Sequence, residues 1–519
     1  MSLYRNILSV GGLTLLSRVF GFVRDAMMAA VLGTGLAADA FYAAFRFPNL
    51  FRRLFAEGAF NTAFVPMFSG ALETGGADHA KALASHIMAW LTAALVVVTI
   101  LAEIFMPVLL QPFVPGFLDD RDKYELTVLL TRILFPYLAC MSLMAAYGAI
   151  LNSLGRYFAA AFAPVLLNIV SIVAMIPLII LAVQGSEAAV WVAIATLAAG
   201  FVQLYAVWEA VRRAGMLPRF ALPRLDPEVR RFWALAVPAI LTGGITQINI
   251  FVGTIIASGA AGAISYLYYA DRLYQLPLGI IGIAIGTVLL PELSKALKGK
   301  RMEEAHGLQS QSLLIAMLLS LPAAAALVAL AEPIVRVLFE RGAFTPEAST
   351  ETARALVAFA WGLPAFVLIR VLQPGFFARE DTRTPTVFAG LSVVLNIALS
   401  LLLFPSLSHV GIAIATTVSA WANTGLLALF LARRGHFLMP MAEARRLGLI
   451  LLSALVMAGL LWGLLLTIAP VFTPGGSFVL QALALAGLCA IGFLVYFGAV
   501  HWSGAMRLGA LLRRLKRSG

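Results

Sequence analysis

The chain has 519 residues, of which 61% are apolar and 12% charged, whereas soluble domains are about 45–50% apolar and about 25% charged. Apolar stretches follow one another from end to end, which excludes a soluble enzyme. The net charge of +12 lacks the basic runs interleaved with aromatic residues that nucleic-acid-binding modules show. The sequence therefore predicts a multi-pass membrane protein with no nucleic-acid partner.

The apolar segments predict an all-α fold of about fourteen transmembrane helices. Segments 91–104 and 447–469 are apolar on all sides, which favours helices over the alternating strands of a membrane barrel. In chain order the predicted helices span 7–32, 38–70, 80–112, 125–152, 158–183, 187–211, 231–257, 262–294, 307–340, 349–378, 385–404, 410–432, 447–469 and 476–506.

Lysine and arginine are unevenly distributed over the predicted connections. The N-terminus and the inner connections carry 24 of the 37 basic residues, whereas the outer connections carry Arg121, Lys123 and Arg341. Because cationic loops stay on the cytoplasmic side, both termini are expected in the cytoplasm. Arg18 and Arg24 interrupt the first apolar segment, so that segment is expected to remain in the mature protein rather than act as a cleavable signal.

The chain also shows an internal repeat at an offset near 226 residues. Six helices per half give both halves the same orientation, as in transporters built from parallel repeats. We therefore expect a six-helix lobe at 1–215, a second at 216–440, and two further helices with a basic cytoplasmic tail at 441–519. The matching positions are Ala59, Thr62, Pro66 and Ser69 with Ala284, Thr287, Pro291 and Ser294, then Pro107 and Gly116 with Pro333 and Gly342, then Pro136 with Pro364, and 167–169 with 395–397.

Four arginines lie inside predicted helices, where together they would cost about 10 kcal/mol if they faced lipid unpaired. They are Arg18, Arg24, Arg52 and Arg272. The nearest acids at similar depth are fewer, and the candidates are Asp25, Asp39, Glu57 and Asp271. A wet cavity with this cationic balance would hold an anion, and the planar fork of arginine suits phosphate oxygens.

Helical spacing predicts the surroundings of these arginines. Arg53 and Glu57 have the spacing of an ion pair, and Ser17 shares a stripe with Arg24. One face of the eighth predicted helix forms a polar wall that should line the cavity, made of Ser265, Tyr268, Tyr269, Arg272 and Gln275. Four other arginines are interpreted as members of structural ion pairs at helix ends: Arg132, Arg336, Arg354 and Arg370.

No catalytic or metal site is predicted. Cys140 and Cys489 lie in apolar runs without a nearby Cys or His, and all six histidines lie near loops or helix ends. The predicted helices contain no paired carboxylates or nucleophile motif. The sequence therefore predicts a non-enzymatic protein without a cofactor.

The segments that carry these charges resemble the MurJ (MviN) family of lipid II flippases, and the resemblance covers the whole chain. The segments are 17–25 (SRVFGFVRD), 39–41 (DAF), 48–60 (PNLFRRLFAEGAF) and 268–273 (YYADRL). The resemblance implies the fold of the superfamily that includes multidrug antiporters and polysaccharide-lipid flippases, with two lobes around a central cavity in a bacterial inner membrane.

The resemblance also implies a substrate and site residues. The substrate would be undecaprenyl-diphosphate-linked peptidoglycan precursor, moved from the cytoplasmic to the periplasmic leaflet, and the last two helices would hold its prenyl tail. Membrane lipids and proteins of cell-wall synthesis or division are further expected partners. The essential cavity cations would be Arg18, Arg24, Arg52 and Arg272, and the functional acids Asp25, Asp39 and Glu57.

The predicted mechanism is alternating access, biased by the membrane potential. Some relatives are expected to bind sodium through carboxylates on the seventh and eleventh helices, but here those helices offer Asn249, Gly253, Asn396 and Ser400, so a sodium site is not expected. Two transporter alternatives remain open: a flippase for another lipid-linked oligosaccharide, and a multidrug antiporter of the same fold. A membrane enzyme acting on lipid-linked glycans and a division scaffold are further alternatives.

Overall fold

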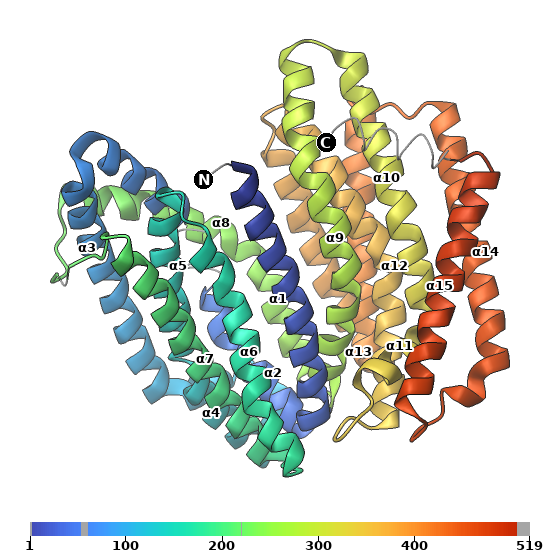
Figure 1. The fold of residues 1–519 in the computed structure, drawn as a ribbon, viewed down its shortest axis with the longest axis horizontal. Coiled ribbons are helices and arrows are strands. Elements are labelled where there is room, and N and C mark those ends of the chain that lie inside the picture. Colours follow the sequence, from blue (N-terminus) through green and yellow to red (C-terminus); the bar gives the residue numbers. More distant parts are fainter. Residues whose placement is uncertain (1–2, 53–60, 220, 506–519) are drawn as a thin grey trace. The chain divides into compact units, whose positions relative to one another are not determined.

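The computed structural model describes residues 3–52, 61–219 and 221–505, and all regular secondary structure in these ranges is helical (Figure 1). The predicted all-α fold is confirmed. Nine helical segments of the described chain are long and apolar enough to cross a membrane. The protein is therefore a multi-pass membrane protein, while the predicted number of fourteen spans stays a prediction.

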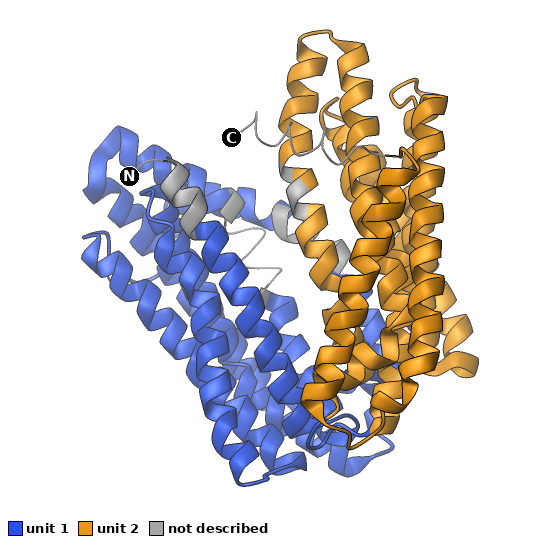
Figure 2. Ribbon diagram, turned by 45° about the vertical axis from the view of Figure 1, so that its right-hand side comes forward, with its two compact units in different colours: residues 1–265, 341–345 blue, residues 266–340, 346–519 orange. Residues whose placement is uncertain are grey.

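The chain divides into two compact units (Figure 2). Unit 1 consists of residues 1–265 and 341–345. Its helices are α1 (Leu3–Leu32), α2 (Leu36–Arg52), α3 (Asn61–Leu110), the 3-10 turn η2 (Pro115–Phe117), α4 (Arg121–Leu134), α5 (Tyr137–Ser153), α6 (Phe158–Ile180), α7 (Gly185–Arg213), α8 (Pro227–Ala257) and the first residues of α9 (Ala263–Lys298).

Unit 2 consists of residues 266–340 and 346–519. The lobe boundaries predicted at 215 and 440 stay predictions. The helices of unit 2 are the rest of α9, α10 (Met302–Ala329), α11 (Ala331–Phe339), α12 (Pro346–Phe377), α13 (Arg383–Arg433), α14 (Met441–Ile468), the 3-10 turn η3 (Ala469–Val471) and α15 (Phe478–Trp502).

Several helices begin or end at places that the apolar pattern did not predict. α3 continues through Gly76, whose φ of 70° kinks it, and α13 continues through Ser408, with φ 50°, so each contains parts of two predicted segments. The predicted segment 125–152 divides at Pro136 into α4 and α5, at a residue that has no N–H to donate to the helical ladder. Segment 307–340 similarly divides at Leu330 into α10 and α11.

Each unit has its own apolar core. In unit 1 side chains of α3, α5, α7 and α8 pack together around Phe64, Phe68 and Ile150. In unit 2 the last two helices, α14 and α15, pack on α10 and α11, and the Tyr496 hydroxyl donates a hydrogen bond to the Leu318 carbonyl at 2.7 Å. This packing fixes the position of the last helix pair within unit 2, and tail binding by that pair stays a prediction.

Candidate functional site

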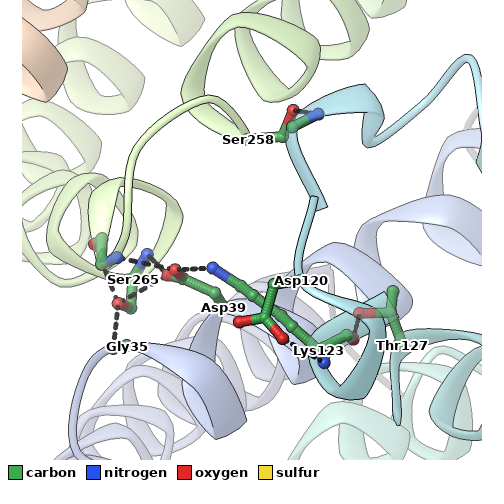
Figure 3. A network of polar contacts seen from close by, with 9 residues as sticks. Gly35, Asp39, Asp120, Lys123, Thr127, Ser258 and Ser265 are labelled. Carbon is green, nitrogen blue, oxygen red and sulfur yellow. Dashed lines mark hydrogen bonds and ion pairs between the residues drawn. The ribbon is translucent and has the colours of Figure 1, made fainter. Parts of the chain in front are cut away.

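A buried carboxylate joins three helices in unit 1. Asp39, on the first turn of α2, is fully buried and accepts hydrogen bonds from the Gly262 and Ser265 N–H groups at 2.7 and 2.9 Å (Figure 3). The Ser265 hydroxyl donates to it at 2.9 Å, and the Lys123 ammonium at 2.8 Å. Asp39 thus caps the N-terminus of α9, whose first N–H groups have no partner in their own helix and carry partial positive charge.

Lys123, on α4, is the part of this network that sequence reasoning missed. Its side chain is 7% exposed, and its ammonium lies 4.1 Å from the centre of the Phe117 ring. A buried carboxylate is costly unless it is paired and fully hydrogen-bonded. Lys123 provides the opposite charge, and the donors at the start of α9 provide the hydrogen bonds. The sequence separation of 84 residues hid the pair, which was counted among outer-connection charges.

Arg24 lies in α1 next to its acidic neighbour. Its Nη2 and Nε atoms lie 2.8 and 3.2 Å from the same Asp25 carboxylate oxygen, and the Arg24 side chain is 13% exposed. Two of the predicted site residues are therefore an ion pair. Asp25 holds the plane of the guanidinium group, so a ligand would meet a preoriented fork.

Arg18 and Ser17 have different surroundings on the same helix. No described residue makes a hydrogen bond or ion pair with the half-buried Arg18 side chain. Ser17 lies against α6, where the Asn168 amide donates to the Ser17 carbonyl at 2.9 Å and approaches its hydroxyl at 3.5 Å. Ser17 therefore joins α1 to α6, while Arg18 has no neutralising neighbour among the described residues.

The predicted site continues into a segment of which little is described. Arg46 on α2 donates to the Thr254 hydroxyl of α8 at 3.1 Å. Arg52 is the last residue of α2, and its side chain lies outside the described residues. Arg53 and Glu57 also lie outside them, so their predicted ion pair stays a prediction.

Ser265 of the predicted polar wall of α9 is fully buried in the Asp39 network, and the rest of the wall divides into three environments. Arg272 donates to the Tyr268 hydroxyl at 2.9 Å, and its guanidinium carbon lies 4.8 Å from the Tyr268 ring centre. The Gln275 amide donates to the Asp271 carboxylate. The prediction for Tyr269 is wrong, because this ring is fully buried against Phe339 in the apolar core of unit 2.

The four arginines interpreted as structural also differ. Arg336 pairs with Glu332 and Glu340, and Arg354 pairs with Glu351 at 3.0 Å, which confirms the interpretation for these two. Arg132 donates instead to the backbone carbonyl of Glu103 at 3.1 Å.

For Arg370 the interpretation as a structural ion pair is wrong. The side chain is exposed, has no ion-pair partner among the described residues, and lies against the backbone of Gly282 on α9. An unpaired arginine inside a spanning helix requires water or an anion near it, so Arg370 joins the candidate cations of unit 2.

The predicted site is rich in arginine and, in the described part of the chain, poor in metal-ligand clusters. Within the described ranges no three His, Cys, Asp or Glu side chains converge as metal ligands do. Arg18 and Arg24 on α1 of unit 1 and Arg272 on α9 of unit 2 carry guanidinium groups instead. Such groups bind phosphate oxygens through paired, charge-assisted hydrogen bonds.

Comparison with known proteins identifies relatives along the whole chain. The family model described as "Lipid II flippase MurJ" matches residues 28–483. The probable lipid II flippase MurJ of Rhizobium meliloti is 48% identical, with 100% of this chain and 97% of the relative covered. The lipid II flippase MurJ of Burkholderia cenocepacia is 35% identical, with 99% and 100% covered.

Solved structures agree with these sequence relatives. A lipid II flippase MurJ in an inward closed conformation superimposes with a TM-score of 0.77 at 26% identity, covering 95% of this chain and 98% of the other. An inward-facing multidrug transporter of the MATE family shares the fold alone, with a TM-score of 0.65 at 15% identity over 82% and 97% of the two chains. The chain belongs to the MurJ family of lipid II flippases, which are transporters and not enzymes.

Proposed function

We propose that this protein moves lipid II from the cytoplasmic to the periplasmic leaflet of a bacterial inner membrane, with both termini in the cytoplasm. Family membership supports the substrate, and the excess of basic residues on the inner connections supports the orientation. The route is alternating access, in which the polar head crosses through a cationic cavity while the prenyl tail remains in lipid.

The observation that carries the proposal is the state of the intramembrane arginines. Arg18 has no partner among the described residues, Asp25 orients Arg24, and Tyr268 holds Arg272 through its hydroxyl and ring. Placing an arginine inside a bilayer costs free energy, and residues that only stabilised the fold would not need to be arginines there. A diphosphate would offer these guanidinium groups further acceptor oxygens, and Arg52 would complete the set.

The test is leaflet exposure of lipid II in proteoliposomes for Arg18→Ala, Arg24→Ala, Arg52→Ala and Arg272→Ala. The rates should fall by about tenfold or more, because each charge-assisted contact to the diphosphate contributes about 1.5–3 kcal/mol. Arg354→Ala is the matched control, since Arg354 is an exposed arginine paired with Glu351 on its own helix. This control should transport at the rate of the unchanged protein.

Two further arms separate the alternatives. Arg24→Lys and Arg272→Lys should regain only part of the rate if the fork geometry matters, because lysine presents a point charge. Competition with a lipid-linked oligosaccharide lacking the peptide, or with a cationic drug, should leave lipid II transport unchanged. Unaltered transport in all four alanine variants would disprove the cationic path.

A further inference from the structure

The coil that joins α7 to α8, residues 214–226 without 220, is fixed along α3 (Figure 1). The Arg219 N–H donates to the Ser85 hydroxyl at 2.8 Å, and the Trp90 indole N–H donates to the Arg224 carbonyl at 3.0 Å. Both hydrogen bonds use backbone atoms of the coil. The side chains of Arg219 and Arg224 are exposed and therefore remain available for other contacts.

The carboxylates of this region face α3. Asp226, the last residue of the coil, lies 2.6 Å from a ring nitrogen of His86 and also caps the N-terminus of α8. Glu228, in the first turn of α8, lies 3.0 Å from a ring nitrogen of His79. The sequence 214–233 contains no other acidic residue. Both acids of this stretch are thus held by histidines of α3.

The same stretch carries four exposed arginines, none of which forms an ion pair with a described carboxylate. They are Arg219, Arg224, Arg230 and Arg231. Arg212 and Arg213, at the end of α7, differ from them because both pair with Glu209, at 2.6 and 2.8 Å. Since the acids are bound to α3, the exposed surface of the coil and of the start of α8 is cationic.

Two leucines of the coil are also exposed. Leu222 and Leu225 are 68% and 55% exposed, and they alternate along the chain with Arg219 and Arg224. A single exposed leucine is ordinary on a protein surface, whereas exposed apolar side chains among arginines are typical of segments that lie in the headgroup layer of a membrane. A coil already fixed on α3 would lose little conformational entropy on binding there.

Tryptophans place this coil near a membrane surface. α3 and α7 belong to the segments that are long and apolar enough to cross a membrane. From Trp90 to Leu110 and from Gly185 to Trp208 these helices rise about 30–35 Å, close to the hydrocarbon thickness of about 30 Å. Tryptophan is enriched where the hydrocarbon meets the headgroups. Because Trp90 bonds directly to the coil, the coil belongs at the level of the headgroups.

We propose that the coil between α7 and α8 is a binding site for anionic phospholipid headgroups, in which Arg219 and Arg224 bind lipid phosphates and Leu222 and Leu225 enter the interfacial layer. The guanidinium fork binds two phosphate oxygens at once. A cytoplasmic leaflet is negatively charged and attracts clusters of arginine at its surface. This site binds resident membrane lipid rather than the transported lipid, so it is independent of the proposed function.

The test is photo-crosslinking of the full chain in nanodiscs of phosphatidylcholine and phosphatidylglycerol, with a trace of either lipid carrying a photoreactive group near its glycerol. Mass spectrometry measures the yield of adducts in the segment 214–231. Phosphatidylglycerol should react there about tenfold or more than phosphatidylcholine, because each arginine near an anionic surface strengthens binding by about fivefold. Arg219→Gln with Arg224→Gln should remove this preference, since the backbone contacts to α3 remain.

Lys298→Gln with Lys300→Gln is the matched control, because it removes two exposed cations from unit 2 and lowers the net charge equally. It should keep the preference for phosphatidylglycerol at 214–231. Leu222→Ser with Leu225→Ser should lower the yield with both lipids, because less apolar surface then enters the interface. Equal yields from the two lipids in the unchanged protein, or an equal loss in the lysine control, would overturn the site.

Two further arms identify the source of the anion. Inorganic phosphate should displace no more lipid than chloride does at the same ionic strength, and stronger displacement would indicate a site for a free anion and overturn the lipid site. Chemical modification of the coil arginines in native membranes forms the second arm. Protection there without a lipid preference in nanodiscs would show that a protein covers the coil, and would likewise overturn the proposal.

Discussion

At the scale of single residues, charges adjacent in sequence could be predicted to interact, while those on separate helices could not. The pair Arg24–Asp25 lies within one turn of α1, so its components were both among the predicted site residues. Lys123 and Asp39 lie on α4 and α2, and nothing in the sequence relates them. Burial decides which of these pairs matters more for folding, because an unpaired charge costs most where water is excluded.

Lys123→Met should destabilise the protein by about 3–5 kcal/mol, because it leaves the fully buried Asp39 without a counter-charge. Thermal unfolding of the purified protein in detergent measures this loss. Lys295→Met is the matched control, since Lys295 forms an exposed pair with Glu292 that should contribute less than about 1 kcal/mol.

The double variant Lys123→Met with Asp39→Asn separates charge from packing. Removing both charges should recover part of the stability lost in Lys123→Met, since no unpaired charge stays buried and the single amide oxygen still accepts a hydrogen bond from one of the two N–H groups at the start of α9. Additive losses in the double variant would mean that the two side chains stabilise the fold independently, contrary to the network described here.

At the scale of elements, the lengths of the apolar segments predicted where helices lie, but they did not predict where those helices are interrupted. A long apolar segment must be helical in a membrane, because every backbone polar group needs a partner. Proline is frequent in such helices, so Pro136, where the chain breaks, could not be told from Pro107, through which α3 continues. Tertiary packing decides between these outcomes, and the apolar pattern contains no information about it.

Charged side chains at helix ends outside the membrane form hydrogen bonds and ion pairs that also stabilise the fold. The Asp381 carboxylate accepts hydrogen bonds from the Thr384 N–H and hydroxyl at the start of α13 and pairs with Arg434 at 2.7 Å. The Thr384 hydrogen bonds, followed by Arg434, lower the pKa of Asp381 to about 2. A lowered pKa in the folded state means that this stabilisation is present above about pH 4 and is lost as the pH falls toward about 2.

Asp381→Ala should therefore lower stability by about 1 kcal/mol at pH 7, through loss of the cap and the ion pair. Asp381→Asn keeps the capping oxygen but does not titrate, so it should remove the part of the acid destabilisation that belongs to this residue. Melting temperatures between pH 7 and pH 3 measure both effects. If the asparagine variant lost stability on acidification as steeply as the unchanged protein, Asp381 would not be the titrating group.

At the scale of the whole molecule, composition was sufficient to predict a multi-pass helical membrane protein, and the charged motifs were sufficient to identify its family. The sequence did not predict which residues surround each charged or polar side chain. Ser17 shares a stripe with Arg24 on a helical wheel but lies against Asn168 of α6, and Tyr269 belongs to the core. Helical spacing gives the direction of a side chain on its own helix, and only neighbouring helices decide what it meets.

The membrane potential should bias lipid II transport without a dedicated ion site. A head group with about two negative charges gains about 4–5 kcal/mol per 100 mV when it moves away from a negative interior. In proteoliposomes, a potassium diffusion potential of either sign should therefore shift the equilibrium distribution of lipid II between the leaflets by about 10³-fold per 100 mV. The measurement is the fraction of lipid II that an external modifying reagent can reach.

Replacing sodium by choline should leave that distribution unchanged. The positions expected to hold sodium carry no carboxylate, and Asn396 and Ser400 hydrogen-bond to each other at 3.0 Å. Liposomes without protein should show no redistribution on the same timescale, which separates catalysed movement from leakage. A distribution indifferent to the potential but dependent on a sodium gradient would show that the charge of the head group does not set the direction, and that a cation must bind elsewhere in the protein.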